Sequence, residues 1–317
     1  MRSTTVTPQT GLLLVHFVED PEGHGERVFF SLADDGDPTG WTRLNGGEPV
    51  LESRIGTTGA RDPHIVRHDA GFTVVATDLR VFGAGPMRWD EWTRTGSRSI
   101  LAWRSPDLVA WSGPALLEVA PPEAGMAWAP EIDWDAAARE HVLTWSSTLY
   151  AADDPDHRGA SYSRILGART DLRRVTDRAV VLDRGTPVID FRGYEVHGRT
   201  VRFAKEEPGP DSLGVFQEVS GEDGRFHLVA SGIGTDRHTR VEAPMLVEDP
   251  ARHRWLLLID QYDRMPQGFV AYASADPFSG EWTALPEEEF RMPPGTKHGG
   301  ILPLVGDEPE RLRHAFG

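Results

Sequence analysis

Short hydrophobic runs, each bounded by turn-forming residues, recur along the whole chain. Examples are GLLLVHF from residue 11, GFTVVATDL from 71, HVLTWSS from 141, TVRFAK from 200 and RWLLLIDQY from 254. Runs of this length that are rich in Val, Leu, Phe, Trp and Thr predict β-strands. The helix-favouring stretches at 136–140 and 308–314 are too short to build a helical layer. The pattern therefore predicts an all-β protein.

A two-part unit repeats along these strands. The first part is a strand start marked by Pro or Asp, seen as RDPHIV at 61, WAPEID at 128, VIDFRGYEV at 188, VEAPMLV at 241 and KHGGILPLV at 297. The anchor residues of these segments are Asp62, Pro130, Asp190, Glu242 and His298, separated by 68, 60, 52 and 56 positions. A period of this length with several strands per unit is typical of the four-stranded blades of a β-propeller.

The second part of the unit is a Ser/Asp turn followed by Trp or Leu. One copy, SLADDGDPTGWTRL at 31–44, precedes the first anchor, while the last anchor has only a short tail after it. The N-terminal strands are therefore expected to complete the blade that the C-terminus begins, which leaves no open sheet edge. We predict one domain over 1–317, a five-bladed β-propeller closed in this way. A β-sandwich with similar turns is the alternative, which the regular Trp-containing units disfavour.

Composition narrows the class of partner. The chain has 33 basic and 49 acidic residues, a formal charge of −16, so most of its surface would repel a nucleic acid or an anionic membrane. It has no cysteine, which excludes disulfides, thiolate metal sites and a cysteine nucleophile. The polar start MRSTTVTPQT and the short apolar run 12–18 do not form a signal peptide, so we expect a cytoplasmic protein. Lys205 and Lys297 are the only lysines among the 33 basic residues, and we assign no function to this bias toward arginine.

Candidate chemistry comes from the anchors. In a propeller the innermost strands line the central axis, so equivalent positions of successive repeats converge on one pocket. Three of the anchors are the carboxylates Asp62, Asp190 and Glu242, and a fourth is His298. Carboxylates that share a cavity repel one another, which raises the pKa of the most crowded one and lets an acid and a base coexist. Glycosidic-bond cleavage needs that pair.

In order and spacing these motifs resemble glycoside hydrolase family 43, the five-bladed propeller arabinosidases and xylosidases. The resemblance runs from LLLVHFVED through NGGEPVL, RDPHIV, GSRSILAWRSPDLVAWS, WAPEIDWD, VID, VEAP and LLLIDQY to KHGGILPL. It implies that Asp62 is the general base, Glu242 the general acid and Asp190 the carboxylate that orients the acid and tunes its pKa. It also implies inversion at the anomeric carbon, with base and acid about 6.5–9.5 Å apart.

Further residues are expected around these three. Trp128 and Glu131 offer an aromatic face and a hydroxyl acceptor for substrate, and Arg192 is expected to narrow the pocket or lower the pKa of nearby carboxylates. His298 matches a histidine that lines the cavity of the family, where related proteins can hold a calcium ion. No second ligand is identifiable from spacing, so we predict no metal and no required cofactor.

Two segments near the pocket are open to a functional and a structural interpretation. The segment 83–96, with Trp89 and Trp92, is a long insertion between strands of the Asp62 blade, and we expect it to shape the substrate entrance. The segment 205–207 follows a strand of the Asp190 blade. It can reach the pocket rim, but we interpret it as a solvated turn.

The substrate implied by the resemblance is a small plant-type oligosaccharide with a terminal pentose, α-L-arabinofuranose first and β-D-xylose second. Two alternatives stay open. A non-catalytic sugar-binding propeller would keep the architecture without turnover, although it has no need of three mutually repelling carboxylates. A related glycoside phosphorylase would need a cationic phosphate pocket, for which Arg61, Arg192 and Lys205 are available.

Overall fold

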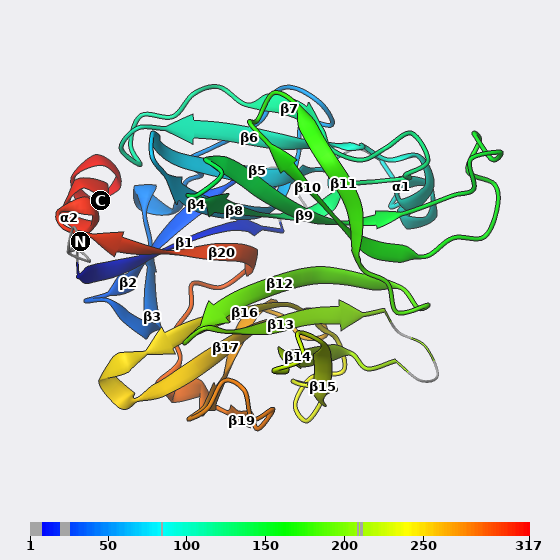
Figure 1. Cartoon of the computed structure of the whole chain (residues 1–317). Helices are drawn as coiled ribbons and strands as arrows, with labels where there is room; N and C mark the ends of the chain where they lie inside the picture. Colours follow the sequence, from blue (N-terminus) through cyan, green and yellow to red (C-terminus); the bar gives the residue numbers. More distant parts are fainter. Residues whose placement is uncertain (1–7, 20–25, 84, 208, 210–211) are drawn as a thin grey trace.

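The computed structural model describes residues 8–19, 26–83, 85–207, 209 and 212–317. Within these residues the strands form five four-stranded antiparallel sheets arranged as the blades of a propeller (Figure 1). The strands of blades 2 and 3 are β4 (Ala60–His68), β5 (Gly71–Asp78), β6 (Ser99–Ser105), β7 (Ala115–Glu118), β8 (Trp128–Asp135), β9 (Glu140–Thr148), β10 (Ser163–Thr170) and β11 (Val175–Leu182). Those of blades 4 and 5 are β12 (Val188–Val196), β13 (Arg199–Glu206), β14 (Val215–Ser220), β15 (Phe226–Ala230), β16 (Val241–Asp249), β17 (Arg254–Gln261), β18 (Gly268–Ser274) and β19 (Thr283–Ala284).

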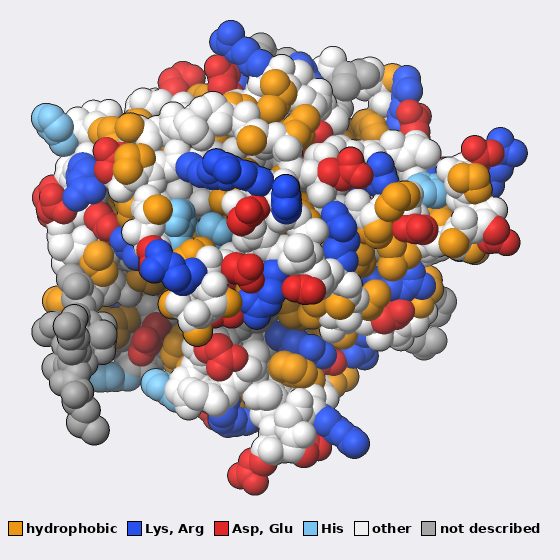
Figure 2. All heavy atoms as spheres, turned by 45° about the horizontal axis from the view of Figure 1, so that its top comes forward, with side chains coloured by type: hydrophobic (Ala, Val, Ile, Leu, Met, Phe, Trp, Pro, Cys, Tyr) orange, Lys and Arg blue, Asp and Glu red, His pale blue; other side chains and the backbone are white. Residues whose placement is uncertain are grey.

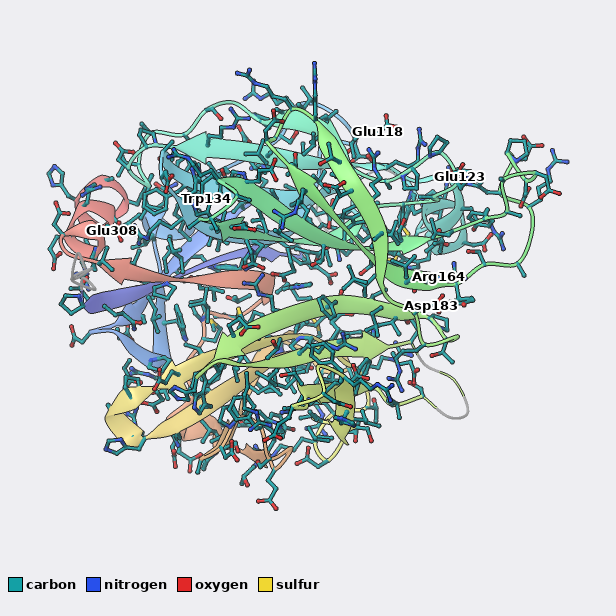
Figure 3. All side chains as sticks on the ribbon, viewed as in Figure 1. Glu118, Glu123, Trp134, Arg164, Asp183 and Glu308 are labelled. Carbon is teal, nitrogen blue, oxygen red and sulfur yellow. The ribbon has the colours of Figure 1, made fainter. Side chains whose placement is uncertain are left out.

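Blade 1 closes the ring, as predicted. It joins β20 (Thr296–Val305) to β1 (Gln9–Val18), β2 (Phe29–Asp34) and β3 (Asp37–Arg43). β20 is the innermost strand of this blade and pairs with β1 from Val305 to Thr296, so the two ends of the chain share one sheet. The C-terminal helix α2 (Glu308–Phe316) packs against both strands (Figure 1). Glu308, which is labelled in Figure 3, lies at the start of this helix. It accepts a 2.8 Å hydrogen bond from Arg67 of blade 2.

Apolar side chains fill the space between neighbouring blades. Successive residues of a strand point to opposite faces of its sheet. In β1, Leu13 and Val15 therefore pack toward blade 2, whereas Leu12 and Leu14 pack toward blade 5. Three more clusters separate blades 2 and 3, 3 and 4, and 4 and 5. Because both faces of each sheet are covered, a strand such as β1 is hydrophobic without alternation, which explains its run LLLV.

A β-bulge interrupts the innermost strand of every blade at the same level. The ladder between β4 and β5 pairs Arg61 with Thr77 and His64 with Val75, so one extra residue is inserted on β4. The same shift occurs on β8, β12, β16 and β20. In four of these bulges a non-glycine residue has positive φ, between 46° and 55°: Asp62, Ala129, Asp190 and Ala243. Such strain is found where a site demands it.

The bulges correct the alignment of the five anchors. The strand registers place Arg61, Trp128, Ile189, Glu242 and Lys297 at one level, just before the bulge. The next residue along each strand, Asp62, Ala129, Asp190, Ala243 or His298, forms the second level. Pro130 and Glu242 are therefore each displaced by one position from the other anchors. All five anchors nevertheless lie on innermost strands, as predicted.

Helices contribute little to the architecture. The insertion at 83–96 contains α1 (Trp89–Thr95), a helix that the hydrophobic pattern did not predict. The segment 136–140 is the turn between β8 and β9, with Glu140 as the first residue of β9. No helix in the described part of the chain is long and apolar enough to cross a membrane. On the face seen in Figure 2, acidic and basic side chains are interspersed.

Candidate active site

The pocket opens at the ends where the inner strands begin. It has a volume of about 350 Å³, and every blade contributes to its lining. Blade 2 supplies Asp62, blade 3 Trp128, blade 4 Asp190, blade 5 Glu242 and blade 1 His298. The structure therefore brings together the three predicted catalytic carboxylates, the predicted aromatic residue and the predicted histidine.

Asp62 is oriented by a side chain of its own blade. Thr77 on β5 donates a 2.9 Å hydrogen bond to Asp62 Oδ2, and the same hydroxyl accepts the backbone N–H of Ala129 at 2.8 Å. Oδ1 of Asp62 lies 3.6 Å from Nδ1 of His298. The Asp62 side chain is 16% exposed. It is thus fixed in direction and still reachable by a water molecule in the pocket.

Asp190 and His298 form a buried charge pair at the centre. Nδ1 of His298 is 3.8 Å from Asp190 Oδ1, and Asp190 Oδ2 accepts the N–H of Ala243 at 3.1 Å. Burial raises the pKa of Asp190 to about 6, against the attraction of His298. Burial alone would lower the pKa of His298, but the carboxylates of Asp190 and Asp62 outweigh it and raise that pKa. The pair therefore holds its protons more tightly than isolated side chains would.

Glu242 is held between the only two lysines of the chain. Its Oε2 accepts a 3.2 Å hydrogen bond from Lys205 Nζ, and its Oε1 lies 3.7 Å from Lys297 Nζ. Burial acts to raise the pKa of Glu242, but these ammonium groups outweigh it and lower the pKa to about 2. The lysines therefore favour the ionised form of Glu242, whereas the pKa of Asp190 is raised. This is the reverse of what a proton donor at Glu242 requires.

The interpretation of 205–207 as a solvated turn was wrong. Lys205 lies on β13, is 4% exposed and reaches across to the next blade. Lys205 has the same position on its strand as Thr77 on β5 and Ser146 on β9. The hydroxyl groups of those two residues accept hydrogen bonds from backbone N–H groups in the bulge of the following blade. The sequence did contain a signal for this contact, namely the rarity of lysine: only two of the 33 basic residues are lysines. Both of them lie beside Glu242.

Aromatic side chains form one wall of the pocket. Trp128 and Trp89 both line it, and their ring centroids lie 6.1 Å apart at an interplanar angle of 82°. Trp92 stacks edge-on against Trp89 at 5.1 Å. Trp89 and Trp92 belong to α1, so the insertion at 83–96 reaches the pocket. An aromatic wall of this kind suits the apolar face of a sugar ring.

Glu131 and Arg192 do not reach the pocket. They lie one layer further along the inner strands, where Glu131 Oε2 is 3.1 Å from Arg192 Nη1 and 3.1 Å from His64 Nε2. They line a separate cavity of about 30 Å³. Burial raises the pKa of Glu131 to about 7, against the attraction of Arg192. Both residues lie two positions beyond the pocket-lining Ala129 and Asp190 on their strands, on the far side of the bulge.

The two residues after His298 have to be glycines, because neighbouring strands pack closely against them. A Cβ on Gly299 would lie 2.0 Å from the carbonyl oxygen of Val15, and one on Gly300 would lie 2.4 Å from the ring of His64. No side chain fits at either position, which explains the KHGG motif. Among the described residues, no group of three or more His, Asp or Glu side chains is placed to hold a metal ion.

Comparison with known families decides the class of this propeller. The sequence profile of a family related to glycoside hydrolase family 43, described as "Probable glycosyl hydrolase domain", matches residues 7–310. The chain belongs to this family. An α-L-arabinofuranosidase of Bifidobacterium longum subsp. longum is 30% identical over 221 residues, which are 65% of this chain and 20% of that protein. The chain thus spans about a fifth of the length of that relative. Family membership and this relative support a glycoside hydrolase.

One solved structure agrees with the family in fold. A thermostable family-43 glycoside hydrolase matches with a TM-score of 0.51 and 15% identity, over 74% of this chain and 75% of that chain. The catalytic domain of a family-62 α-L-arabinofuranosidase from Coprinopsis cinerea matches with a TM-score of 0.49 and 15% identity, over 77% and 71% of the two chains. At this identity the first likeness concerns the propeller fold alone.

Proposed function

We propose that this chain is an inverting glycoside hydrolase that removes terminal pentose residues, α-L-arabinofuranose first and β-D-xylose second, from small oligosaccharides. The observation that carries the proposal is the convergence of Asp62, Asp190 and Glu242, from three different blades, on one pocket. Family membership and the arabinofuranosidase relative support the class of reaction and the order of the two sugars.

Each of the three carboxylates is assigned one role in the proposed reaction. Asp62, oriented by Thr77, accepts a proton from a water molecule as the water oxygen attacks the anomeric carbon. Glu242 in its protonated form donates to the glycosidic oxygen as that bond breaks, which yields a product of inverted configuration. Asp190 stays buried beside His298 and fixes the backbone next to Glu242 through its bond to Ala243.

The charges favour hydrolysis over phosphorolysis. Arg61 is paired with Glu19 at 3.0 Å and with Glu26 at 3.1 Å. Arg192 lies outside the pocket, and Lys205 is paired with Glu242. Each of the three cations that a phosphate pocket would require is therefore already neutralised by a carboxylate. Water needs no such pocket.

The test is hydrolysis of 4-nitrophenyl α-L-arabinofuranoside, β-D-xyloside and β-D-galactoside, with and without phosphate. Asp62→Asn should lower turnover of the accepted sugar by about 10²–10⁴-fold, the range typical for loss of a general base. Glu222→Gln, at an exposed hairpin tip, is the matched control and should have no effect. Proton NMR of the first product should show the inverted anomer.

Other outcomes would point elsewhere. Turnover only in the presence of phosphate would establish a phosphorylase. Sugars that raise the melting temperature without being released from any glycoside would establish a binding propeller. A product of retained configuration would overturn the assignment of Asp62 as a base that activates water.

A further inference from the structure

The ionic contacts of Glu242 conflict with its proposed role as proton donor, and this inference rests on that role. Both carboxylate oxygens face an ammonium group, Oε2 that of Lys205 and Oε1 that of Lys297. Two ammonium groups this close favour the ionised form of Glu242, whereas a proton donor has to carry a proton before the glycosidic bond breaks. One of the two contacts must therefore open before the reaction.

The two lysines differ in their freedom to move. Lys297 is 1% exposed and lies 3.0 Å from Oδ1 of Asp260, whose side chain is fully buried. Lys205 Nζ instead has two alternative partners close by. The Tyr262 hydroxyl accepts from it at 3.1 Å, and Glu207 Oε1 lies 3.4 Å away. Glu207 lines the same pocket, and its side chain is 36% exposed.

The other titratable groups around Glu242 also bear on which of the two lysines can move away from it. The titratable groups that face it come from β12, β13, β17 with the residue that follows it, and β20: Asp190, Lys205, Asp260, Tyr262, Lys297 and His298. Lys205 has a second pocket-lining carboxylate, Glu207, only 3.4 Å away. The pocket-lining Glu19 also attracts Lys297, but it is paired with Arg61 at 3.0 Å. A sugar that enters the pocket therefore meets Lys205 and Glu207 together.

We propose that Lys205 is a positioning residue that controls the protonation of Glu242, and that Glu207 receives its ammonium group when a glycoside fills the pocket. Before a glycoside binds, the contact with Lys205 favours the ionised form of Glu242. When sugar hydroxyls occupy the space beside Glu242, the ammonium group moves toward Glu207 while Tyr262 keeps its bond. Glu242 then takes up a proton from solvent.

The proton balance of this step is simple. The proton that Glu242 takes up passes to the glycosidic oxygen as the bond to the anomeric carbon breaks. The attacking water gives its proton to Asp62, which returns it to solvent after the products leave. Glu242 ends as a carboxylate, and Lys205 then pairs with it again. One water molecule is consumed, and nothing is oxidised or reduced.

The experiment compares Glu207→Gln with wild type on two glycosides of the same sugar. One has a 2,4-dinitrophenyl leaving group, which departs without a proton, and the other has a methyl group, which needs one. Glu207→Gln removes the charge that receives Lys205, so kcat/KM for the methyl glycoside should fall roughly tenfold or more. The dinitrophenyl glycoside should change less than about threefold. Glu222→Gln should change neither.

A second variant separates the proposal from a general loss of structure. Lys205→Met leaves Oε2 of Glu242 free in every state, so adding Glu207→Gln to it should cause no further loss on the methyl glycoside. Equal losses on both glycosides, or the same penalty for Glu207→Gln with and without Lys205, would overturn the role of Lys205 and leave the hydrolase standing. If wild type hydrolyses neither glycoside, the proposed function itself fails.

Discussion

Replacing Asp190 by Asn should stabilise the protein at neutral pH while it impairs the site. Asp190 is buried and has a pKa raised from 3.8 to about 6. Because one pKa unit corresponds to about 1.4 kcal/mol, keeping this carboxyl ionised at pH 7.5 costs the folded state about 3 kcal/mol. An amide can still accept the N–H of Ala243 but loses the attraction to the His298 ring. We therefore expect a net gain of about 1–3 kcal/mol in the free energy of unfolding.

The stability gained by Asp190→Asn should depend on pH. The folded state binds the Asp190 proton more tightly than the unfolded chain, so its contribution to stability is full below pH 3.8 and is lost as the pH rises through about 6. The advantage of Asp190→Asn should accordingly be largest at pH 7.5 and nearly vanish at pH 4. Urea unfolding followed by tryptophan fluorescence at both pH values measures it, with Glu222→Gln as control. A variant less stable than wild type at pH 7.5, or a gain equal at both pH values, would refute the reasoning.

Three further changes test the pocket and the ring. Trp128→Ala should raise KM about tenfold or more and change kcat less, because the sugar ring loses an aromatic contact face that contributes roughly 1–3 kcal/mol to binding. Initial rates over a series of substrate concentrations measure KM and kcat. Thr77→Val should lower kcat and cost about 1–3 kcal/mol in unfolding free energy, since Asp62 loses its orienting bond and a buried N–H its acceptor; unchanged kinetics would contradict this. Leu13→Ala, fully buried in the closing blade, should cost about 2–5 kcal/mol in urea unfolding, whereas Leu116→Ala at an exposed site should cost less than about 0.5.

The repeat and its closure could be predicted because they depend on local signals. Strand alternation, turn residues and the spacing of Asp62, Asp190 and His298 can be read along the chain, and four of the five blades are local meanders of consecutive strands. The family model confirms the class that the motifs resemble. The carboxylates were placed on inner strands for the same reason, and the structure brings them to one pocket.

What depends on blades meeting in space could not be predicted. Pro130 and Glu242 each lie one position away from the level of the other anchors, and Glu131 and Arg192 lie in a separate cavity outside the pocket. No local pattern records that Lys205 of one blade reaches Glu242 of the next, because this contact is set by the angle between two sheets. The sequence by itself determined the five blades and the types of residue around the axis. Only the tertiary structure decided which charges are neighbours, and Coulomb forces between neighbours determine which carboxyl holds a proton.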